Sequence, residues 1–357
     1  MEKKSGNPRI TNYGRRILEK GIVEDGRIID KGKLASELHK LTEDAHPYPL
    51  ETSRVVASIP ESKTFIHVFS LPADLDGEEL RQAARSEAKR VLPLEEKELY
   101  SDILFGGIPE NNSRQVLYAV CEKRVADDFR ETFERAGLRL LVLDLESFSI
   151  ARALFHAQPL TKPVCIVDLG ARTINVTIYE KGLIQFSGTI FLGGIALTGE
   201  ISRALSALPE KAELLKRETG FNPEKEDGRV MLVLQKEFQH VISELGKMAR
   251  FFKEKTGKEI EKGILVGGTS LIPGLSEYLN ANMKIRFELA NPLENIDVRV
   301  FTDAKDASGA PIETPHGAIL ANVVGLAIRG AGGNIERAGI NFLPRKSENL
   351  LEKLIHT

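Results

Sequence analysis

The amino-acid sequence predicts an α/β protein with two sheets. Apolar runs of strand length alternate with stretches in which apolar residues recur every three or four positions, which is the period of a helix. This alternation occurs once before about residue 160 and again after it. A chain of 357 residues also exceeds what one ordinary hydrophobic core supports, so two or more subdomains are expected.

The elements of the first part follow from apolar patterning and turn residues. They are, in order, a strand pair or bent strand at 9–23 closed by the turn Glu24-Asp25-Gly26, a helix with Leu34, Leu38 and Leu41 on one face, strands at 55–60 and 64–71, a helix at 77–91, hairpin strands at 100–105 and 115–121, a helix at 123–136, a strand at 138–143 and a helix at 146–157. Residues 71–140 therefore read as a compact inserted α/β unit.

The second part repeats the pattern with a long helix in its middle. The predicted elements are strands at 164–167, 174–179, 183–190, 262–266 and 285–288, helices at 196–205 and 316–329, a loop at 302–315, and a helix with an apolar stripe from Leu234 to Phe252. The stripe favours a core-facing helix over a coiled coil, because fewer than four heptads are present.

Composition excludes several classes of protein. The 49 basic and 51 acidic residues give a formal net charge of −2, which does not indicate attraction to nucleic acid or an anionic membrane. Cys121 and Cys165 lie in apolar runs, which is typical of buried thiols in a reducing compartment. No apolar stretch is long enough to cross a bilayer, and the charged start does not resemble a signal peptide. We expect a cytoplasmic protein.

The most informative stretch is the strand ending in Asp168, followed by Gly170 and Thr173 and then a second strand. Glycine allows a ligand to approach backbone N–H groups, and threonine adds a hydroxyl beside them. Asp168 at the strand end is suited to a hydrated divalent cation. The pattern indicates a phosphate–Mg²⁺ site, and an acidic turn between two strands remains the alternative.

Three further segments are candidates for the same site. Gly267, Gly268 and Thr269 end a strand and permit close approach of a base or an α-phosphate, or form a plain strand–helix turn. Glu213 and Lys216 share a helical face, which suits ribose hydroxyls and a base edge, or an exposed i, i+3 pair.

Asp144 and Glu146 stand at the head of the helix that follows the strand at 138–143. Carboxylates in this position can orient an attacking water, which makes both residues candidate catalytic groups. Capping of the helix N-terminus explains them equally well.

The order and spacing of these segments resemble the actin-like ATPase superfamily, and within it the PilM family of type IV pilus assembly proteins. The resemblance covers about residues 10–330 and is carried by the segments 21–30, 55–62, 64–72, 144–154, 168–173, 193–194, 211–216, 265–275 and 325–330. It implies an actin-like ATPase fold of two domains, each with a mixed sheet flanked by helices, and an inserted FtsA-type α/β subdomain.

The resemblance also implies a division of the chain and a role for each motif. Residues 1–70 and 141–160 would form the N-terminal subdomain, 71–140 the insertion, 161–330 the C-terminal nucleotide-binding domain, and 331–357 a tail. The cofactors it implies are ATP and Mg²⁺. The residues matched to nucleotide binding are Asp168, Gly170, Thr173, Gly193, Gly194, Glu213, Lys216, Gly267, Gly268 and Thr269, with Asp168 as the metal ligand. Residues 144–154 and 318–328 match the two helices of the interdomain hinge.

The two ends of the chain depart from the family pattern. The first phosphate loop, D-x-G-S/T-S-x-x-K, has no counterpart before Arg9, so we expect Met1 to be an internal residue of a longer protein and hydrolysis by this chain to be weak or absent. Ile340–Pro344 resembles the I-N-L-L-P peptide of PilN, the membrane protein that PilM binds; an apolar turn fixing the C-terminus is the alternative. Residues 347–355 indicate an interaction helix or a packed cap.

These features predict a cytoplasmic scaffold at the inner face of the cytoplasmic membrane, in which ATP occupancy sets domain closure and closure sets affinity for a PilN-like peptide. The expected partners are that peptide and, through Ile340–Pro344, a second copy of the chain, with no nucleic acid and only indirect membrane contact. The alternatives are an FtsA-like cell-division protein, the cytoplasmic domain of a type II secretion L-type protein, and a kinase of the same superfamily.

Overall fold

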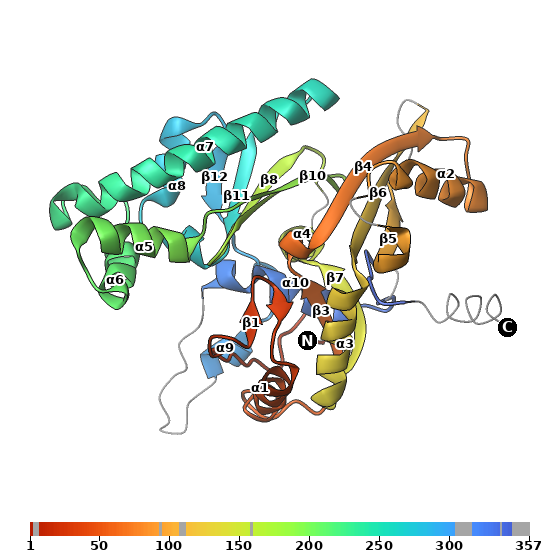
Figure 1. Ribbon diagram of the computed structural model, residues 1–357, viewed down its shortest axis with the longest axis horizontal. Helices are drawn as coiled ribbons and strands as arrows, with labels where there is room; N and C mark the ends of the chain where they lie inside the picture. Colours follow the sequence, from red (N-terminus) through yellow and green to blue (C-terminus); the bar gives the residue numbers. More distant parts are fainter. Residues whose placement is uncertain are drawn as a thin grey trace. The chain divides into compact units, whose positions relative to one another are not determined.

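The computed structural model describes residues 1–2, 7–92, 95–106, 112–157, 160–303, 316–335 and 338–344 (Figure 1). Contacts divide the chain into two compact units. Unit 1 comprises Met1–Ala153, Leu293–Thr314 and Asn322–Thr357, and unit 2 comprises Leu154–Pro292 and Pro315–Ala321. The chain therefore leaves unit 1 within helix α4 (Glu146–Phe155) and returns to it at Leu293. It enters unit 2 once more at Pro315 and comes back to unit 1 at the start of α10 (Ala321–Ala331).

Unit 2 contains a five-stranded mixed sheet in the order β10-β9-β8-β11-β12. Its strands are β8 (Val164–Leu169), β9 (Ile174–Glu180), β10 (Leu183–Ile190), β11 (Lys262–Val266) and β12 (Arg286–Leu289). The first three strands in sequence are antiparallel neighbours, while β11 runs parallel to β8 and β12 parallel to β11. Lys181 and Gly182 join β9 to β10 in a tight hairpin, because both adopt the positive φ that a two-residue turn requires.

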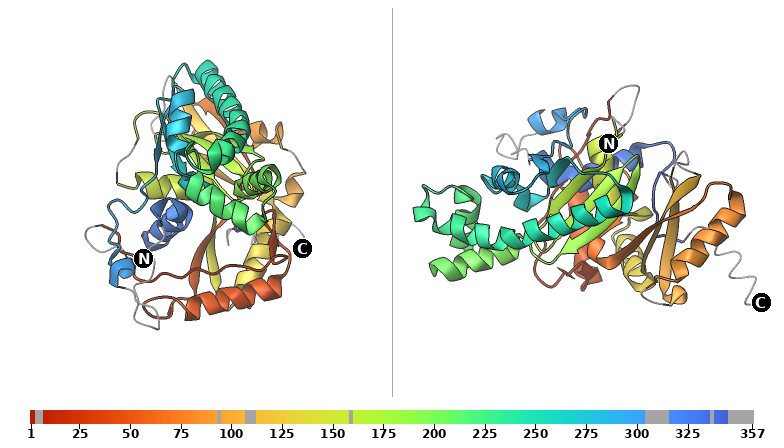
Figure 2. Two further views of the ribbon diagram at one scale, coloured as in Figure 1. Left: turned by 90° about the vertical axis from the view of Figure 1, so that its left-hand side faces the viewer. Right: turned by 90° about the horizontal axis from the view of Figure 1, so that it is seen from above.

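The helices of unit 2 bury an apolar core against this sheet. They are α5 (Gly194–Leu205), α6 (Pro209–Thr219), α7 (Arg229–Thr256) and α8 (Leu275–Asn282). Helix α7 runs along the sheet (Figure 2), and its buried residues include Leu234, Phe238 and Val241. The predicted core stripe is confirmed, since it packs with the strand residues into one hydrophobic cluster.

Unit 1 holds two larger pieces of sheet. The parallel pair consists of β3 (Arg54–Ile59) and β7 (Arg139–Leu145), and the antiparallel sheet has the order β4-β6-β5, from β4 (Thr64–Pro72), β6 (Ser113–Glu122) and β5 (Leu99–Phe105). Helix α2 (Gly77–Lys89) packs on β4 and β6, and α1 (Lys31–Glu43) packs on α3 (Lys123–Arg135). The side chain of Asp30 caps α1 by accepting from the N–H of Lys33.

Three expectations about the elements were wrong. Residues 9–23 form no regular strand pair; they make isolated bridges at Arg9 and Tyr13, and the two-residue strands β1 (Val23–Glu24) and β2 (Arg27–Ile28) flank the predicted turn. The described residues form four sheets rather than two, because β4 pairs with β6 and not with β3, and because β1 and β2 pair only with each other. The helix predicted at 316–329 begins as a 3₁₀ turn, Gly317–Leu320, before α10. Most of the predicted loop at 302–315 and all of the segment 347–355 lie outside the described residues.

Both cysteines are buried and free, as predicted. Burial raises the pKa of both thiols, to about 12 for Cys165, so neither forms a thiolate at neutral pH. Within the described ranges, no helix combines the length and apolar character needed to cross a membrane.

Candidate functional site

The Asp168 turn is the strand–turn–strand hairpin that the sequence predicts. Asp168 lies opposite Asn175 near the end of the β8–β9 ladder. The N–H of Gly170 donates to the carbonyl of Thr173 over 3.0 Å and closes the turn. A Cβ atom on Gly170 would lie 2.9 Å from that same oxygen, so a side chain there would force the turn open.

The N-terminus of α5 lies directly against this hairpin. The N–H of Gly194 donates to the carbonyl of Gly170 over 3.0 Å. A Cβ atom on Gly193 would lie 2.5 Å from the carbonyl carbon of Arg172. Gly193 is therefore required because the backbone of one loop packs on the backbone of the other. At Gly194 a Cβ atom would lie 2.6 Å from Oγ1 of Thr269.

The loop after β11 completes the cluster. The hydroxyl of Thr269 donates to the carbonyl of Gly170 over 2.9 Å. Gly267 has a φ of +85°, and a Cβ atom there would lie 2.5 Å from Oδ1 of Asp168. Nothing lies within 4 Å of the Cβ position of Gly268. Three loops that are distant in sequence thus share one carbonyl acceptor and leave open space at Gly268.

Lys216 of α6 contacts the N-terminal part of α5, which lies against the same loops. Its Nζ donates to the carbonyl of Gly194 over 2.8 Å, to Oγ1 of Thr198 over 2.7 Å and to Oε2 of Glu213 over 2.6 Å. The residue is 5% exposed, which rules out the alternative of a solvent-exposed pair. These three hydrogen bonds equal the three protons of the ammonium group.

Glu213 is the partly exposed member of this pair. Partial burial acts to raise its pKa, but hydrogen bonds from Lys216, Thr198 and Arg217 outweigh burial and lower the pKa of Glu213 to about 2. The carboxylate is therefore charged at neutral pH, with one oxygen facing Lys216 and the other facing Arg217.

A divalent cation would have few protein ligands here. Among the described residues, no three His, Cys, Asp or Glu side chains are grouped closely enough to hold a metal ion. A single carboxylate beside a phosphate-binding loop is nevertheless a common arrangement for Mg²⁺, which keeps its waters and shares the phosphate oxygens. The residues present fit Mg²⁺ only as part of a nucleotide complex.

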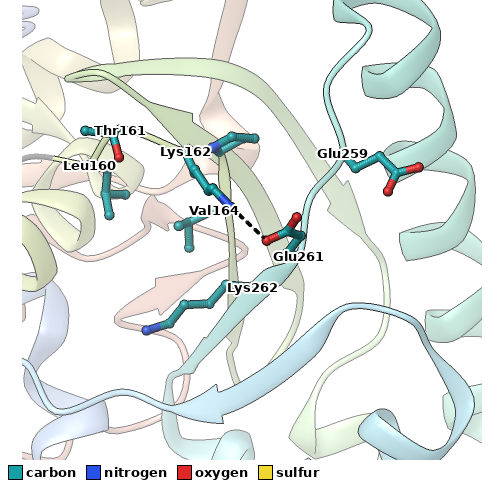
Figure 3. A pocket seen from close by; sticks show the side chains of 8 residues that line it. Leu160, Thr161, Lys162, Val164, Glu259, Glu261 and Lys262 are labelled. Atoms are coloured by element: carbon teal, nitrogen blue, oxygen red, sulfur yellow. Dashed lines mark hydrogen bonds and ion pairs between the residues drawn. The ribbon is translucent and has the colours of Figure 1, made fainter.

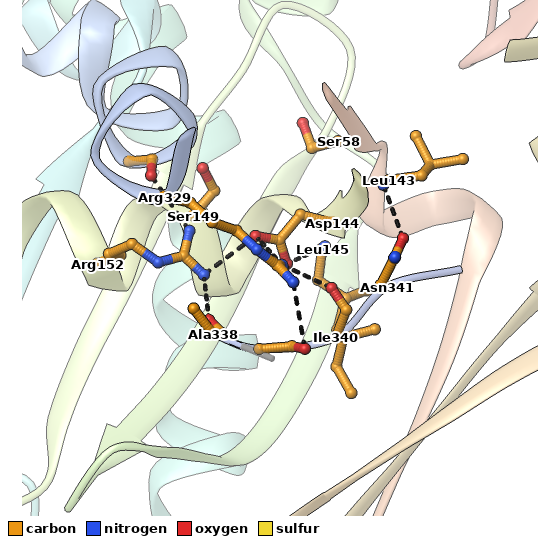
Figure 4. A network of polar contacts seen from close by, with 12 residues as sticks. Ser58, Leu143, Asp144, Leu145, Ser149, Arg152, Arg329, Ala338, Ile340 and Asn341 are labelled. Carbon is orange, nitrogen blue, oxygen red and sulfur yellow. Dashed lines mark hydrogen bonds and ion pairs between the residues drawn. The ribbon is translucent and has the colours of Figure 1, made fainter. Parts of the chain in front are cut away.

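Asp144 and Glu146 belong to unit 1 and have protein partners of their own. Asp144 is fully buried, and its Oδ2 lies 2.7 Å from Nη1 of Arg329 and 3.0 Å from Nη2 of Arg152, in two ion pairs (Figure 4). Glu146 accepts from the N–H of Glu61 over 3.3 Å. These contacts support a structural role for Asp144, because a water-orienting carboxylate needs access to solvent.

The segment Ile340–Pro344, which the sequence indicated as a PilN-like peptide or an apolar turn, is buried where 338–344 meets β7, and the sequence did not predict the residues that receive it. Ile340 and Phe342 are 0% and 1% exposed. The N–H of Phe342 donates to the carbonyl of Leu143 over 2.9 Å, and the N–H of Leu143 donates to Oδ1 of Asn341 over 3.0 Å. The N–H of Asn341 donates to Oδ2 of Asp102 over 3.0 Å. We call Leu143, Asp102 and Arg329 the β7 docking surface.

Arg329 lies at the centre of this surface (Figure 4). It is a fully buried side chain, whose Nη1 donates to the carbonyl of Ile340 over 2.6 Å and whose Nη2 donates to that of Gly339 over 3.3 Å. Burial lowers the pKa of Arg329, and Asp144 acts in the opposite direction. The sequence holds one signal for Arg329, which is its position in an otherwise apolar helix, because a buried arginine requires polar partners.

A pocket of about 340 Å³ opens at the other end of the unit 2 sheet (Figure 3). It is lined by Leu160, Thr161, Lys162, Pro163, Val164, Glu259, Glu261 and Lys262. Val164 and Lys262 begin β8 and β11, whereas the Asp168 and Gly267 loops follow the opposite ends of these strands. The pocket contains no residue of the predicted site, and its Lys162–Glu261 ion pair is exposed.

Comparisons with known proteins agree with this picture. The family model for type IV pilus assembly protein PilM matches residues 1–331. Among solved structures, one described as the PilM-PilN type IV pilus biogenesis complex is similar with a TM-score of 0.74 and 23% identity, over 89% of this chain and 90% of that chain. The predicted actin-like α/β fold is confirmed by this similarity, while the bounds of the inserted subdomain stay a prediction.

Curated relatives are cell division proteins. FtsA of Neisseria meningitidis is 24% identical over 174 residues, which is 42% of this chain and 41% of that protein. FtsA of Buchnera aphidicola (strain APS) is 27% identical over 100 residues, 28% of this chain and 24% of that protein. The chain thus matches less than half the length of these relatives.

Proposed function

The chain belongs to the family of type IV pilus assembly protein PilM, and from this premise we propose that it is a nucleotide-binding scaffold whose unit 1 holds a PilN-like peptide. The observation that carries the proposal is the seat of Ile340–Pro344 on the β7 docking surface. This segment resembles the I-N-L-L-P peptide of PilN, and a solved structure that is similar to this chain is described as a PilM-PilN complex.

The segment lies beside β7 and is joined to it by one main-chain hydrogen bond, from Phe342 to Leu143, and by the side chain of Asn341, which accepts from the N–H of Leu143. The N–H and C=O of one strand residue point to the same side, so the two bonds of Leu143 show that the segment lies along one edge of β7. A peptide at a strand edge is held by hydrogen bonds to the main chain of the strand, and its buried side chains supply selectivity. Ile340 and Phe342 are the buried side chains here. We propose that the same surface accepts the peptide of a PilN-like inner-membrane protein or of a second copy of this chain.

In unit 2 we propose that the Asp168, Gly193–Gly194 and Gly267–Thr269 loops bind ATP with Mg²⁺. The glycines bring backbone groups close to one another and leave room at Gly268, which supports phosphate binding. Asp168 would hold the cation through its waters, and Glu213 would accept from ribose hydroxyls. Bound Mg²⁺ supplies charge neutralisation to the phosphates.

We further propose that the two sites are linked, so that nucleotide changes the affinity of the β7 docking surface for its peptide. Linkage is reciprocal, and the peptide must then change the affinity for nucleotide by the same factor. The protein would work at the inner face of the cytoplasmic membrane, bound there through its partner.

Capture of a PilN-like peptide tests the proposal. An immobilised peptide containing I-N-L-L-P is offered to the full chain, to a chain lacking residues 338–357, and to a control lacking only residues 345–357. We expect strong capture only by the chain lacking residues 338–357, because only that deletion removes the segment bound at the β7 docking surface. Equal capture of all three proteins, or capture of none, would contradict the proposed function.

A further inference from the structure

We infer that Arg329 is the positioning residue of the β7 docking surface and that it ties the end of α10 to the presence of a bound peptide. This inference rests on the proposed function, because it concerns how the peptide of that function is held. It names a residue in a helix that carries none of the nucleotide-binding motifs.

The first support is the set of acceptors around the guanidinium. Arg329 donates through Nη1 and Nη2 to the carbonyls of Ile340 and Gly339, and through Nε to the carbonyl of Ile335. Two of these acceptors belong to the docked segment. A buried donor without an acceptor raises the free energy of the folded protein. We therefore expect Arg329 to change its position when the docked segment is absent.

The second support is the balance of charge. Arg329 and Arg152 both face the single carboxylate of Asp144, which is fully buried. Arg152 also donates to the carbonyl of Ala338 over 3.1 Å. The carboxylate of Asp102 also acts on Arg329, so two cations face two carboxylates in this region. The carbonyls of residues 338–340 accept further N–H groups of the two guanidiniums, which a buried arginine must place on acceptors.

The third support is the tight fit of α10 on α4. A Cβ atom on Gly325 would lie 1.7 Å from the carbonyl oxygen of Ser149, and Arg152 donates to the carbonyl of Gly325 over 3.2 Å. A helix packed this closely cannot absorb a displaced arginine by small adjustments. Loss of the peptide is therefore expected to loosen the last turn of α10 rather than only the side chain of Arg329.

Amide hydrogen exchange in a mutant cycle tests the inference. The four proteins are the full chain, the Arg329→Lys variant, the chain lacking residues 338–357, and the combination of both changes. Lysine keeps the charge but loses the planar fork of donors. Arg135→Lys, at an exposed ion pair of α3, is the matched control.

We expect the deletion to speed exchange in residues 326–331 by about tenfold in the parent chain, within the usual range for coupled sites. In the Arg329→Lys background the same deletion should change exchange little, and Arg329→Lys alone should speed exchange of the Phe342 amide. Equal effects of the deletion in both backgrounds would overturn the inference.

A second arm applies if Arg329→Lys does not fold. The chain lacking residues 338–357 is saturated with a peptide of the sequence 338–344, or with the same peptide carrying an ester between Gly339 and Ile340. This ester weakens the Gly339 carbonyl as an acceptor and keeps the Asn341 N–H that donates to Asp102. We expect less protection of residues 326–331 by the ester form at full occupancy, and equal protection would overturn the inference. Failure of the normal peptide to bind would instead contradict the proposed function.

Discussion

At the scale of single residues, Asp168 is the side chain on which the nucleotide proposal depends most. It ends the strand that leads into the glycine turn, and its carboxylate lies beside the backbone of Gly267. We predict that Asp168→Ala lowers the affinity for Mg²⁺-ATP by about tenfold or more, equal to about 1.4 kcal/mol, without unfolding the protein. Titration calorimetry measures the affinity, and Glu200→Ala on α5 removes an equal charge elsewhere in unit 2. Unchanged binding in Asp168→Ala would refute the role of Asp168.

Glu213 makes the folding stability of unit 2 depend on pH. Its pKa falls from 4.5 to about 2 on folding, so the unfolded chain binds the proton more readily. The stabilisation by the charged carboxylate is therefore present above about pH 4.5 and is lost as the pH falls towards 2.

We predict that Glu213→Gln lowers the free energy of unfolding by about 1 kcal/mol at pH 7, since the side chain is partly exposed and solvent screens it. Wild type and variant should converge near pH 2. Urea unfolding at several pH values measures the difference, with Glu200→Gln as the control. A constant difference at every pH would be inconsistent with the shifted pKa.

At the scale of helices and strands, the contact between α4 and α10 is the most sensitive feature of unit 1. We predict that Gly325→Ala destabilises the protein by about 3 kcal/mol, because its methyl group would overlap the backbone of Ser149. Gly246→Ala in α7 is the matched control, since nothing lies within 4 Å of its Cβ position. That change should stabilise the helix by roughly 0.5–1 kcal/mol. The denaturant midpoint should fall in Gly325→Ala and rise in Gly246→Ala. Shifts of the midpoint in the same direction for both variants would argue against the close contact of α10 with α4.

At the scale of the whole molecule, the segment 338–344 is expected to act as part of the core of unit 1. Two fully buried side chains, Ile340 and Phe342, contribute about 1.5–3 kcal/mol each before the entropy of ordering is subtracted. We predict that deletion of residues 338–357 lowers the unfolding temperature by roughly 5–10 °C. A free peptide of sequence 338–344 should restore it in a concentration-dependent way, and a scrambled peptide should not. No shift on deletion would show that the segment is not docked in solution.

The sequence by itself determined the elements and the local chemistry of the loops. Periods of two and of 3.6 residues depend only on neighbours in the chain, so β8 and β9 could be predicted close to their observed bounds, and the apolar stripe from Leu234 to Phe252 identified the middle of α7. The turns at Gly170 and at Gly267–Gly268 could also be predicted, because the close approach of two backbone segments requires glycine. The strand pair predicted at 9–23 was wrong, because apolar and polar residues do not alternate regularly along that segment.

The tertiary structure alone decided which distant segments meet. The pairing of β4 with β6, the shared carbonyl of Gly170, and the burial of Lys216 all join residues far apart in the chain. The ion pair of Asp144 with Arg329 and the hydrogen bond of Phe342 to Leu143 each span more than 180 residues. Contacts of this kind depend on how whole elements pack, and no local pattern in the sequence encodes them.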